Sequence, residues 1–392
     1  MSRSSTEATV SVQAIIDLIS DLVRIDSVTP WLVEGGAGEA EVVRYFTDWV
    51  RDLPVEVEIQ EIAPGRQNFI ATLRGTGGGP SLCLNAHADT VGYAGWPDAA
   101  LVPRLDGDRL YGLGAADDKG CCAIALLALR HLATSGVPLR GDLVVACVAD
   151  EEGVSIGSEH LVRTMKPDLA IVLEADALPK VIVEHQGFGW LDIVIGGRAA
   201  HGSTPDQGVD AIVGLAQVLS RLHAWDLEHF AGVPEPRNGR TVFHTGTVRG
   251  GTDYATYPSQ AVVGIEIGTQ PGETMMDRVH EIEAIIATVV AEMPGLTGEV
   301  QIRLEREPFL AVGHEALLES LRRATLKNMG CDIEAVGLNA WTDAALMQAA
   351  GTPTVMLGPL GGNFHSPNEW VSIPDVVTSI DILIDTIVEV LS

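Results

Sequence analysis

Three apolar segments of this sequence share one feature: each ends in histidine or acidic residues. They are Ser81–Ala86 followed by His87-Ala-Asp89, Leu143–Ala149 followed by Asp150-Glu-Glu152, and Leu169–Leu173 followed by Glu174. Short apolar runs of this kind are typical of buried strands. In α/β sheets, binding sites lie beyond the carboxyl ends of the strands. The pattern therefore predicts an α/β fold in which these polar groups share one edge of a sheet.

His87 and Asp89 are two residues apart, so on a strand their side chains point to the same face. A histidine that binds a metal through one ring nitrogen needs its other nitrogen held, often by a carboxylate. We therefore interpret His87 as a metal ligand and Asp89 as the residue that orients it. A hydrogen-bonded pair with a purely structural role has the same sequence, so this hypothesis depends on the rest of the chain.

The remaining periodicity predicts two domains. The chain has 392 residues, more than one hydrophobic core usually serves. Strand and helix patterns alternate up to residue 186 and again from 308, whereas 187–307 shows strands and two helices typical of an α+β module. We therefore predict a catalytic domain in two parts, 1–186 and 308–392, with a mostly parallel sheet flanked by helices. The α+β domain at 187–307 is predicted to be inserted into it.

The individual elements follow from the same patterns. Helices are predicted at about 10–25, 39–52, 121–135, 209–223, 273–291 and 374–391, and from 314 onward. Strands are predicted at 55–60, 68–73, 81–86, 143–149, 169–173, 190–195, 241–249, 261–267, 299–304 and 353–357, and near 334.

The formal net charge is −28. A surface of this charge repels phosphate backbones and anionic lipids, so neither a nucleic acid nor a membrane is expected as a partner. Residues Met1–Glu7 lead into an amphipathic segment, and no apolar run reaches the roughly 18 residues of a membrane helix. We expect a soluble, cytoplasmic protein whose partner is a small-molecule substrate. The five cysteines lie in apolar surroundings without Cys-x-x-Cys spacing, and we expect them in the core.

Two further segments carry groups suited to a metal. Tyr111–Gly120 is glycine-rich, contains Asp117 and Asp118, and opens a predicted helix. The helix dipole favours carboxylates at its start, which is one explanation for both aspartates, but the glycines indicate a close approach of the backbone to another group. Near the C-terminus, Gly361–Glu369 contains His365. Nitrogen and carboxylate ligands without thiolates suit zinc, with cobalt or manganese as alternatives.

The candidate ligands are His87, Asp117, Glu152, Glu174 and His365. The positive charge of two zinc ions equals the negative charge of three carboxylates and one bridging hydroxide, which a partly buried site requires. One further carboxylate at a strand end, Glu151, is not needed as a ligand. A dinuclear hydrolase needs such a base to take the proton of the attacking water.

In combination and in order, these motifs resemble the dinuclear zinc hydrolase family that includes acetylornithine deacetylase, succinyl-diaminopimelate desuccinylase, aminoacylase and carboxypeptidase G. The resemblance covers essentially the whole chain. It implies that Asp117 bridges two Zn²⁺ ions. In such proteins the peptide bond after this aspartate is often cis. It also implies that His87 and Glu174 complete one metal site, and that Glu152 and His365 complete the other.

The same resemblance implies a zinc-exopeptidase-like catalytic domain, with Glu151 as general base and the insert as a lid and dimerisation domain. His201, in Ala200–Pro205, would enter the partner subunit's site in a homodimer and stabilise the oxyanion; a surface histidine in a turn is the alternative. The implied reaction is hydrolysis of the amide bond of a small N-acyl amino acid or related N-acyl compound. A dipeptidase or a carboxypeptidase is the alternative within the family.

Two positions depart from the pattern of the deacylase branch. Ala255 stands where these lids carry asparagine, and Gly268 stands where they carry an arginine that binds the substrate carboxylate. Glycine cannot replace such a bidentate contact. Either Arg198, Arg240 or Arg249 takes over this contact, or the substrate lacks the α-carboxylate, as for an amidohydrolase or a deaminase.

Two interpretations from outside this class are also open. The stretch Gly153–Gly157 fits the nucleophile elbow of a serine esterase, with Asp343 and His365 following in triad order, but it leaves the other strand-end groups without a role. The second interpretation is a metal-binding homologue without catalysis. The presence of every expected ligand and of the base argues against it. The remaining histidines are expected to be structural or exposed, and this expectation is weakest for His185, at the entry to the insert. Trp341 and Asp343 are expected to line the pocket.

Overall fold

The computed structural model describes residues 9–96 and 100–392. The chain divides into two compact units. Unit 1 consists of the chain up to Val183 with Ala311–Ala335 and Leu346–Ser392, and unit 2 consists of Glu184–Leu310 and Val336–Ala345. The N-terminal stretch on which the expected cytoplasmic location was based lies outside the described residues, so that location stays a prediction.

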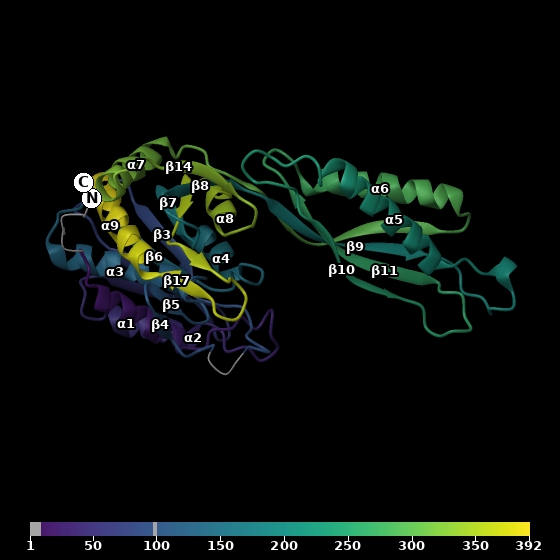
Figure 1. The fold of residues 1–392 in the computed structure, drawn as a ribbon, viewed down its shortest axis with the longest axis horizontal. Coiled ribbons are helices and arrows are strands. Elements are labelled where there is room, and N and C mark those ends of the chain that lie inside the picture. The colour runs from purple at the N-terminus through teal and green to yellow at the C-terminus, as the bar shows by residue number, and fades with distance from the viewer. Residues whose placement is uncertain (1–8, 97–99) are drawn as a thin grey trace. The chain divides into compact units, whose positions relative to one another are not determined.

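Unit 1 is built on a large mixed sheet (Figure 1). In spatial order its strands are β1 (Glu56–Ala63), β2 (Arg66–Leu73), β6 (Leu143–Val148), β3 (Leu82–His87), β7 (Leu169–Leu173), β15 (Thr354–Leu357) and β8 (Lys180–His185). β3 is parallel to β6 and β7, and β7 is parallel to β15. β1, β2 and β8 add antiparallel pairs on either side. The predicted α/β fold with a mostly parallel central sheet is confirmed.

Helices flank this sheet. They are α1 (Val12–Val23), α2 (Ala40–Val50), α3 (Lys119–Ser135), α4 (Ile156–Thr164), α7 (Glu315–Met329), α8 (Ala344–Ala349) and α9 (Ile373–Leu391). α3 and α9 pack against β3, α1 and α7 pack on these two helices, and α2 and α4 pack against β2. α3 is apolar on nearly all sides, which is typical of a fully buried helix. Every residue from Lys119 to Leu129 is buried.

A small second sheet in unit 1 joins two distant parts of the chain. Its order is β16 (Gly361–Gly362), β17 (Trp370–Ser372), β5 (Arg109–Tyr111) and β4 (Arg104–Asp106). These strands were not predicted, because runs of two or three residues show no periodicity. Trp370 of β17 lies opposite Tyr111 of β5. The pairing brings the segment that contains His365 beside the glycine-rich segment that contains Asp117.

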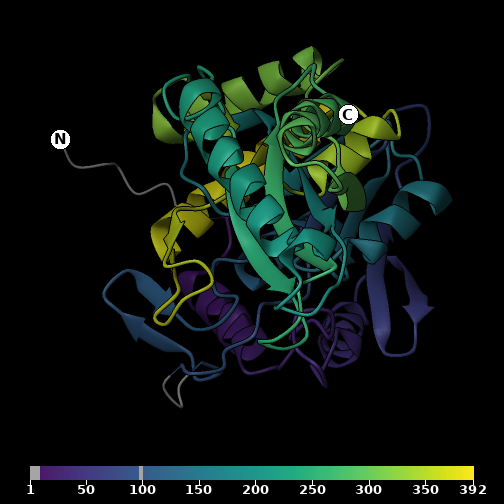
Figure 2. The same ribbon diagram turned by 90° about the vertical axis from the view of Figure 1, so that its right-hand side faces the viewer.

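Unit 2 has an antiparallel sheet with two helices packed on it (Figure 2). The sheet has the order β10 (Phe243–Gly250), β11 (Gln260–Thr269), β9 (Gly187–Gly196) and β12 (Thr297–Arg306), and the helices are α5 (Ala211–His229) and α6 (Met275–Glu292). Short elements η1 (Pro205–Gln207), β13 (Phe309–Leu310) and β14 (Glu334–Leu338) complete the described fold. The core of unit 2, with Ile193, Val263 and Ile282 fully buried, lies between sheet and helices. This unit combines an antiparallel sheet with helices, and Val336–Ala345 also belongs to it.

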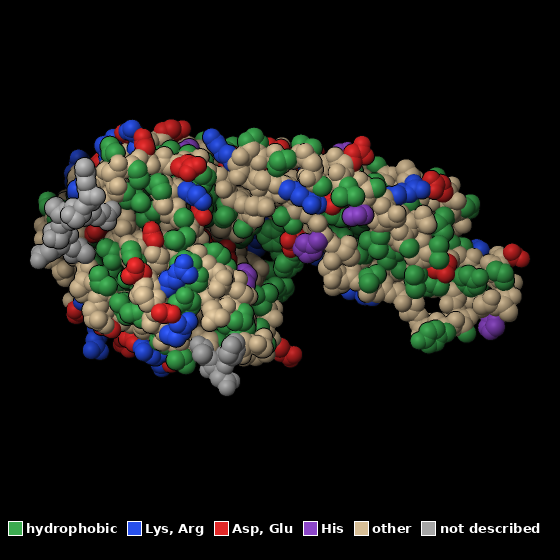
Figure 3. All heavy atoms as spheres, viewed as in Figure 1, with side chains coloured by type: hydrophobic (Ala, Val, Ile, Leu, Met, Phe, Trp, Pro, Cys, Tyr) green, Lys and Arg blue, Asp and Glu red, His purple; other side chains and the backbone are tan. Residues whose placement is uncertain are grey.

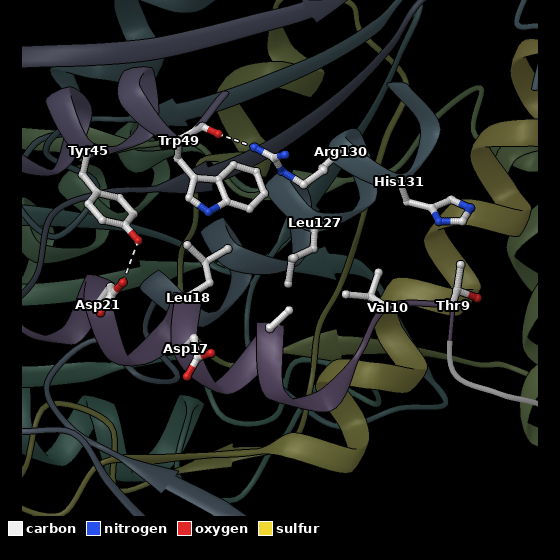
Figure 4. Close-up of a pocket in the computed structure, with 11 residues that line it drawn as sticks. Thr9, Val10, Asp17, Leu18, Asp21, Tyr45, Trp49, Leu127, Arg130 and His131 are labelled. Carbon is white, nitrogen blue, oxygen red and sulfur yellow. Dashed lines mark hydrogen bonds between the residues drawn. The ribbon is translucent and has the colours of Figure 1, made fainter. Parts of the chain in front are cut away.

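A surface pocket of about 430 Å³ lies between α1, α2 and α3. The Tyr45 hydroxyl donates a hydrogen bond to Asp21 (3.0 Å), and the Arg130 guanidinium stacks 4.2 Å from the ring centre of Trp49 (Figure 4). None of the residues that line this pocket is a predicted metal ligand. The pocket is therefore separate from the strand-end groups.

Three expectations from composition concern the surface and the thiols. Among the described residues, no helix is long and apolar enough to cross a bilayer. On the face seen in Figure 3, acidic side chains are scattered and do not form one patch.

The cysteines are free thiols, and four are buried as predicted. The prediction was wrong for Cys331, which is exposed because it directly follows the end of α7 at Gly330.

Candidate metal centre

The carboxyl ends of three neighbouring strands carry the polar groups that the sequence placed there. His87 is the last residue of β3 and lies opposite Val148 of β6. The turn Asp150–Gly153 follows β6, and Glu174 follows β7 directly. Because β6, β3 and β7 are parallel neighbours, their ends lie at one edge of the sheet, where α/β proteins bind ligands.

Asp117 lies between two histidines. Its Oδ1 is 2.9 Å from Nε2 of His87, and its Oδ2 is 3.1 Å from Nε2 of His365. Glu174 Oε1 lies 3.6 Å from the same nitrogen of His87, and Glu152 Oε1 lies 3.0 Å from that of His365. The structure thus brings all five predicted ligands together, with one carboxylate shared between two His–Glu pairs. The peptide bond after Asp117 is cis, as the resemblance implied.

The electrostatics of this cluster reflect burial and close pairing. Burial opposes ionisation of Asp117, but hydrogen bonds from His365 and His87 outweigh it and hold the pKa of Asp117 below its ordinary value. Hydrogen bonds to Asp117 and Glu152 raise the pKa of His365 to about 11. Burial raises the pKa of Glu152 to about 6, and it raises the pKa of Glu174 well above its ordinary value. Burial therefore favours the neutral forms of Glu152 and Glu174 when the two histidines supply the positive charge beside them.

Buried carboxylates whose ionisation is opposed in this way fit divalent cations, which favour the ionised form. Among the described residues, the ion-pair partners of Asp117, Glu152 and Glu174 are histidines, with no lysine or arginine. Buried carboxylates without enough positive charge are costly in a medium of low dielectric constant, and bound cations remove that cost. Imidazole and carboxylate donors suit zinc, cobalt or manganese. Cation binding must displace the protons that the histidines carry.

Asp118 also lies next to the ligands, although the sequence analysis gave it no role there. Its Oδ2 accepts a hydrogen bond from the backbone N–H of His87 (3.1 Å). One of its oxygens lies within 4.8 Å of ligand atoms of His87 and Glu174. Asp118 stands at the N-cap position of α3, as expected, but its side chain makes no capping hydrogen bond to the helix. The only sequence signal was its position beside Asp117.

Asp89 contacts His87 at the end of β3 and the turn after β6 that contains Glu151. Nδ1 of His87 is 3.1 Å from the backbone carbonyl oxygen of Asp89 and 3.5 Å from its carboxylate, so the carbonyl is the nearer acceptor. The carboxylate of Asp89 accepts the backbone N–H groups of Glu151 (3.0 Å) and Glu152 (3.2 Å). The residue that was expected to orient His87 therefore also holds the turn that contains Glu151.

A buried arginine holds the same turn from the other side. Nη2 of Arg66 lies 2.8 Å from Glu39 and 2.6 Å from Asp150. The Thr29 hydroxyl donates to the same oxygen of Asp150 (2.7 Å). Glu39 and Asp150 are almost completely buried. Because Asp150 begins the turn, this network fixes the backbone that presents Glu151.

Replacing Arg66 with methionine leaves Glu39 and Asp150 buried without a cation. We expect a loss of about 3–5 kcal/mol in the free energy of unfolding, measured by urea denaturation followed by circular dichroism. The matched control is Arg74→Met at the other end of β2, where the arginine forms exposed ion pairs with Glu56 and Asp142. Exposed pairs contribute little to stability. An equal loss in both variants would contradict the importance of the buried network.

Glu369 holds the glycine-rich loop that carries the shared carboxylate. Its oxygens accept the backbone N–H groups of Gly114 (3.2 Å), Ala116 (2.9 Å) and Asp117 (3.1 Å). Burial raises the pKa of Glu369 to about 7. A Cβ added at Gly114, where φ is +74°, would lie 2.9 Å from the side chain of the buried Lys119. The close approach that the glycines indicated is therefore to Glu369 and Lys119.

The predicted oxyanion residue His201 belongs to unit 2, on the exposed segment between β9 and η1. Its Nδ1 is 2.8 Å from the Ser203 hydroxyl and accepts the Ser203 backbone N–H (3.2 Å). A neutral imidazole has one donor and one acceptor nitrogen. With Nδ1 as acceptor, Nε2 carries the proton and can donate to an oxyanion.

The position of the missing lid arginine is closed by another side chain. A Cβ added at Gly268 would lie 2.6 Å from Oε1 of Gln186. Gln186 is buried; its amide nitrogen donates to the carbonyls of Asn238 (3.1 Å) and Arg240 (2.8 Å), and its oxygen accepts the N–H of Val242 (3.1 Å). A long side chain at 268 therefore does not fit without breaking this network.

The three arginines considered as substitutes are already engaged within unit 2. Arg240 pairs with Asp226, Arg249 pairs with Asp192, and Arg198 donates to the carbonyl of Gln207. A substrate carboxylate would have to compete with these partners.

His185 is buried in unit 2. Its Nδ1 donates to the carbonyl of Gln186 (2.8 Å), its Nε2 is 3.2 Å from the Thr342 hydroxyl, and its ring packs against Phe309 and Trp341. Burial lowers the pKa of His185 to about 4. These contacts fit a structural role.

The depressed pKa of His185 predicts an acid-dependent loss of stability. Folding favours the neutral ring, so this contribution is present above the ordinary pKa of 6.5 and is lost as the pH falls toward about 4. At about 1.4 kcal/mol per pKa unit, the loss amounts to roughly 3 kcal/mol. We expect His185→Gln to reduce the decline in urea stability between these pH values, and the exposed His223→Gln to leave it unchanged. A wild-type slope in His185→Gln would refute this assignment.

The serine of the predicted nucleophile elbow is poorly placed for an esterase. Ser155 precedes α4 and is only 1% exposed, whereas a nucleophile must reach its substrate. Nε2 of His365 contacts Asp117 and Glu152. Asp343, the third member of that triad, belongs to unit 2. These positions favour the metal centre over the serine triad.

Two histidines on either side of a shared carboxylate, beyond the ends of parallel strands, place the protein in the class of metal-dependent hydrolases. Residues 83–389 match the model of Peptidase family M20/M25/M40, and the chain belongs to this family. The predicted family and the prediction of a metal-dependent enzyme are confirmed.

Acetylornithine deacetylase of Aliivibrio fischeri (strain MJ11) is 28% identical over 382 residues, which cover 94% of this chain and 96% of that protein. The fold is similar to that of aminopeptidase PepT from Bacillus cereus ATCC 10987, with a TM-score of 0.78, 22% identity and coverage of 98% and 100%. It is also similar to the Bacillus subtilis YXEP protein, a dinuclear metal binding peptidase from the M20 family, with a TM-score of 0.72, 16% identity and coverage of 97% and 98%.

Proposed function

We propose that this chain hydrolyses the amide bond of a small N-acyl amino acid or related N-acyl compound. His87, Asp117 and Glu174 would hold one divalent cation, and Asp117, Glu152 and His365 would hold the second. The observation that carries the proposal is the pair of histidines on opposite oxygens of the partly buried Asp117 carboxylate. Zinc is the proposed metal, with cobalt or manganese as alternatives.

Glu151 is the proposed general base and acid. Cations held at these ligands would supply a lowered pKa for water and polarisation of the substrate carbonyl. Glu151 takes the proton of the attacking water and returns it to the leaving amine. The backbone N–H of Glu151 is fixed by Asp89, and this contact limits the positions that its carboxylate can reach.

The proposed assembly is a homodimer formed through unit 2. β10 is an edge strand of its sheet, and every residue from His244 to Gly250 is exposed. An exposed edge strand offers unpaired backbone groups to another strand. In such a dimer His201 would donate its Nε2 proton to the oxyanion in the partner subunit. Sedimentation equilibrium at the monomer mass would contradict this assembly.

The preferred substrate class is set by unit 2. Because Gln186 fills the space beside Gly268, we propose that N-acyl compounds without a tightly bound α-carboxylate are hydrolysed best. A dipeptidase or tripeptidase activity is the second candidate, supported by the structural similarity to aminopeptidase PepT. N-acetyl amino acids, their carboxamides, and di- and tripeptides separate these possibilities.

The test combines metal analysis with this substrate panel. We expect the metal-free protein to be inactive, zinc to restore activity, and the carboxamides to exceed the free acids in kcat/KM. Activity that survives chelation, with inactivation by a serine-directed reagent, would support the esterase interpretation. Two bound metals without hydrolysis of any substrate would support a binding protein.

A further inference from the structure

The loop between α1 and α2 exposes three consecutive large apolar side chains. Trp31, Leu32 and Val33 have exposed fractions of 55%, 47% and 36%. Single exposed apolar residues are ordinary, whereas a contiguous group marks a contact surface. We call these three residues the apolar rim.

The apolar rim touches two of the chain segments that carry proposed metal ligands, those with Glu152 and His87. A Cβ added at Gly153 would lie 3.0 Å from Cβ of Trp31, and one added at Gly92 would lie 2.5 Å from Cγ2 of Val33. Gly153 directly follows Glu152 in the turn after β6. Gly92 lies shortly after the end of β3. Within unit 1, two rim residues therefore contact the chain directly after Glu152 and shortly after His87.

Hydrogen bonds hold the rim in place. Thr29, two residues before Trp31, donates its N–H to the carbonyl of Thr90 (3.0 Å) and its hydroxyl to Asp150 (2.7 Å). The N–H of Val33 donates to the carbonyl of Thr29 (3.2 Å). The backbone is thus anchored to both ligand-bearing segments. A surface that is already ordered loses little entropy when a ligand covers it.

We infer that the apolar rim selects substrates with a bulky apolar group, aromatic or branched aliphatic, next to the scissile amide. This inference rests on the proposed function, because it names the substrate class of the same site. Covering exposed apolar side chains with such a group is favourable, whereas a methyl group covers little of this surface. Trp31 has the largest exposed fraction of the three and is the principal specificity-determining residue.

The test compares kcat/KM for N-acetyl-phenylalanine amide and N-acetyl-alanine amide. We expect Trp31→Ala to reduce the value for the phenylalanine compound about tenfold, which corresponds to about 1.4 kcal/mol, and to leave the alanine compound within about twofold. Trp31→Phe should retain most of the discrimination. A matched pair of variants is Val33→Ala and Val57→Ala; both valines are exposed in unit 1, and Val57 lies on β1 away from the ligands.

Other outcomes overturn the inference. Equal losses for both substrates would assign Trp31 a structural role. If the ratio of kcat/KM for the two amides stays the same but the sedimentation mass of Trp31→Ala changes, the rim is an interface between protein chains. If the wild type hydrolyses neither amide, the proposed function is wrong, and calorimetric binding of N-acetyl-phenylalanine amide then decides the role of the rim. Equal affinity in the wild type and Trp31→Ala would refute that role as well.

Discussion

The Glu151→Gln protein is expected to keep both metal ions and to lose about a thousandfold in kcat. Glutamine has nearly the same shape as glutamate, but it cannot accept the proton of water at neutral pH. General base catalysis typically contributes factors of this order. The substitution leaves the backbone N–H that Asp89 holds in place. Steady-state kinetics on the best amide substrate, together with metal analysis, measures both expectations.

The control for this substitution is Glu61→Gln, an exposed glutamate on β1. It makes the same chemical change away from the strand ends, and we expect wild-type kcat. If Glu151→Gln retains activity within about threefold while binding both metals, Glu151 is not the base. If it loses the metals as well, its role is structural and the kinetic result does not report proton transfer.

The Asp117→Asn protein is expected to lose metal binding and, with it, activity. The two oxygens of the Asp117 carboxylate lie 2.9 Å and 3.1 Å from the two histidines. An amide offers one acceptor oxygen where the carboxylate offers two, so asparagine could not provide a ligand atom beside each histidine. In the wild type, zinc at a thousand times its dissociation constant should raise the free energy of unfolding by about 4 kcal/mol. In Asp117→Asn, we expect most of this stabilisation to disappear.

Urea denaturation with and without zinc measures the effect, and Asp106→Asn on β4 is the control. Asp106 is exposed and pairs with Arg104. Equal zinc stabilisation in Asp117→Asn and in the wild type would show that the shared carboxylate does not bind metal. The proposed site would then have to be abandoned even if the protein is an active hydrolase.

Much of unit 1 was predictable because its strands are short, apolar and followed by polar residues. β3 and β6 are buried at every position, so β6 appears in the sequence as an uninterrupted apolar run and β3 as an apolar run broken by Asn85 before it ends at His87. β4, β5, β16 and β17 were missed because each has only two or three residues. The pairing of β5 with β17 joins residues more than two hundred positions apart, which no local pattern reports.

In the site, too, residues marked by local patterns could be predicted, whereas those that depend on long-range packing could not. His87, Glu152 and Glu174 could be found because they follow recognisable strands, and Asp117 and His365 because the whole set resembles a known family. Asp118, Arg66 and Gln186 carried no comparable signal. A buried arginine between two acids looks in the sequence like any surface arginine, because burial and pairing arise only when distant segments pack together.

The sequence by itself determined which residue types stand at the strand ends, because periodicity and burial are local consequences of side-chain chemistry. Only the tertiary structure decided that the two oxygens of Asp117 face different histidines and that Gln186 occupies the space beside Gly268. Both depend on side-chain directions set by long-range packing. Such directions change with every contact across the fold, whereas the pattern of apolar and polar residues does not.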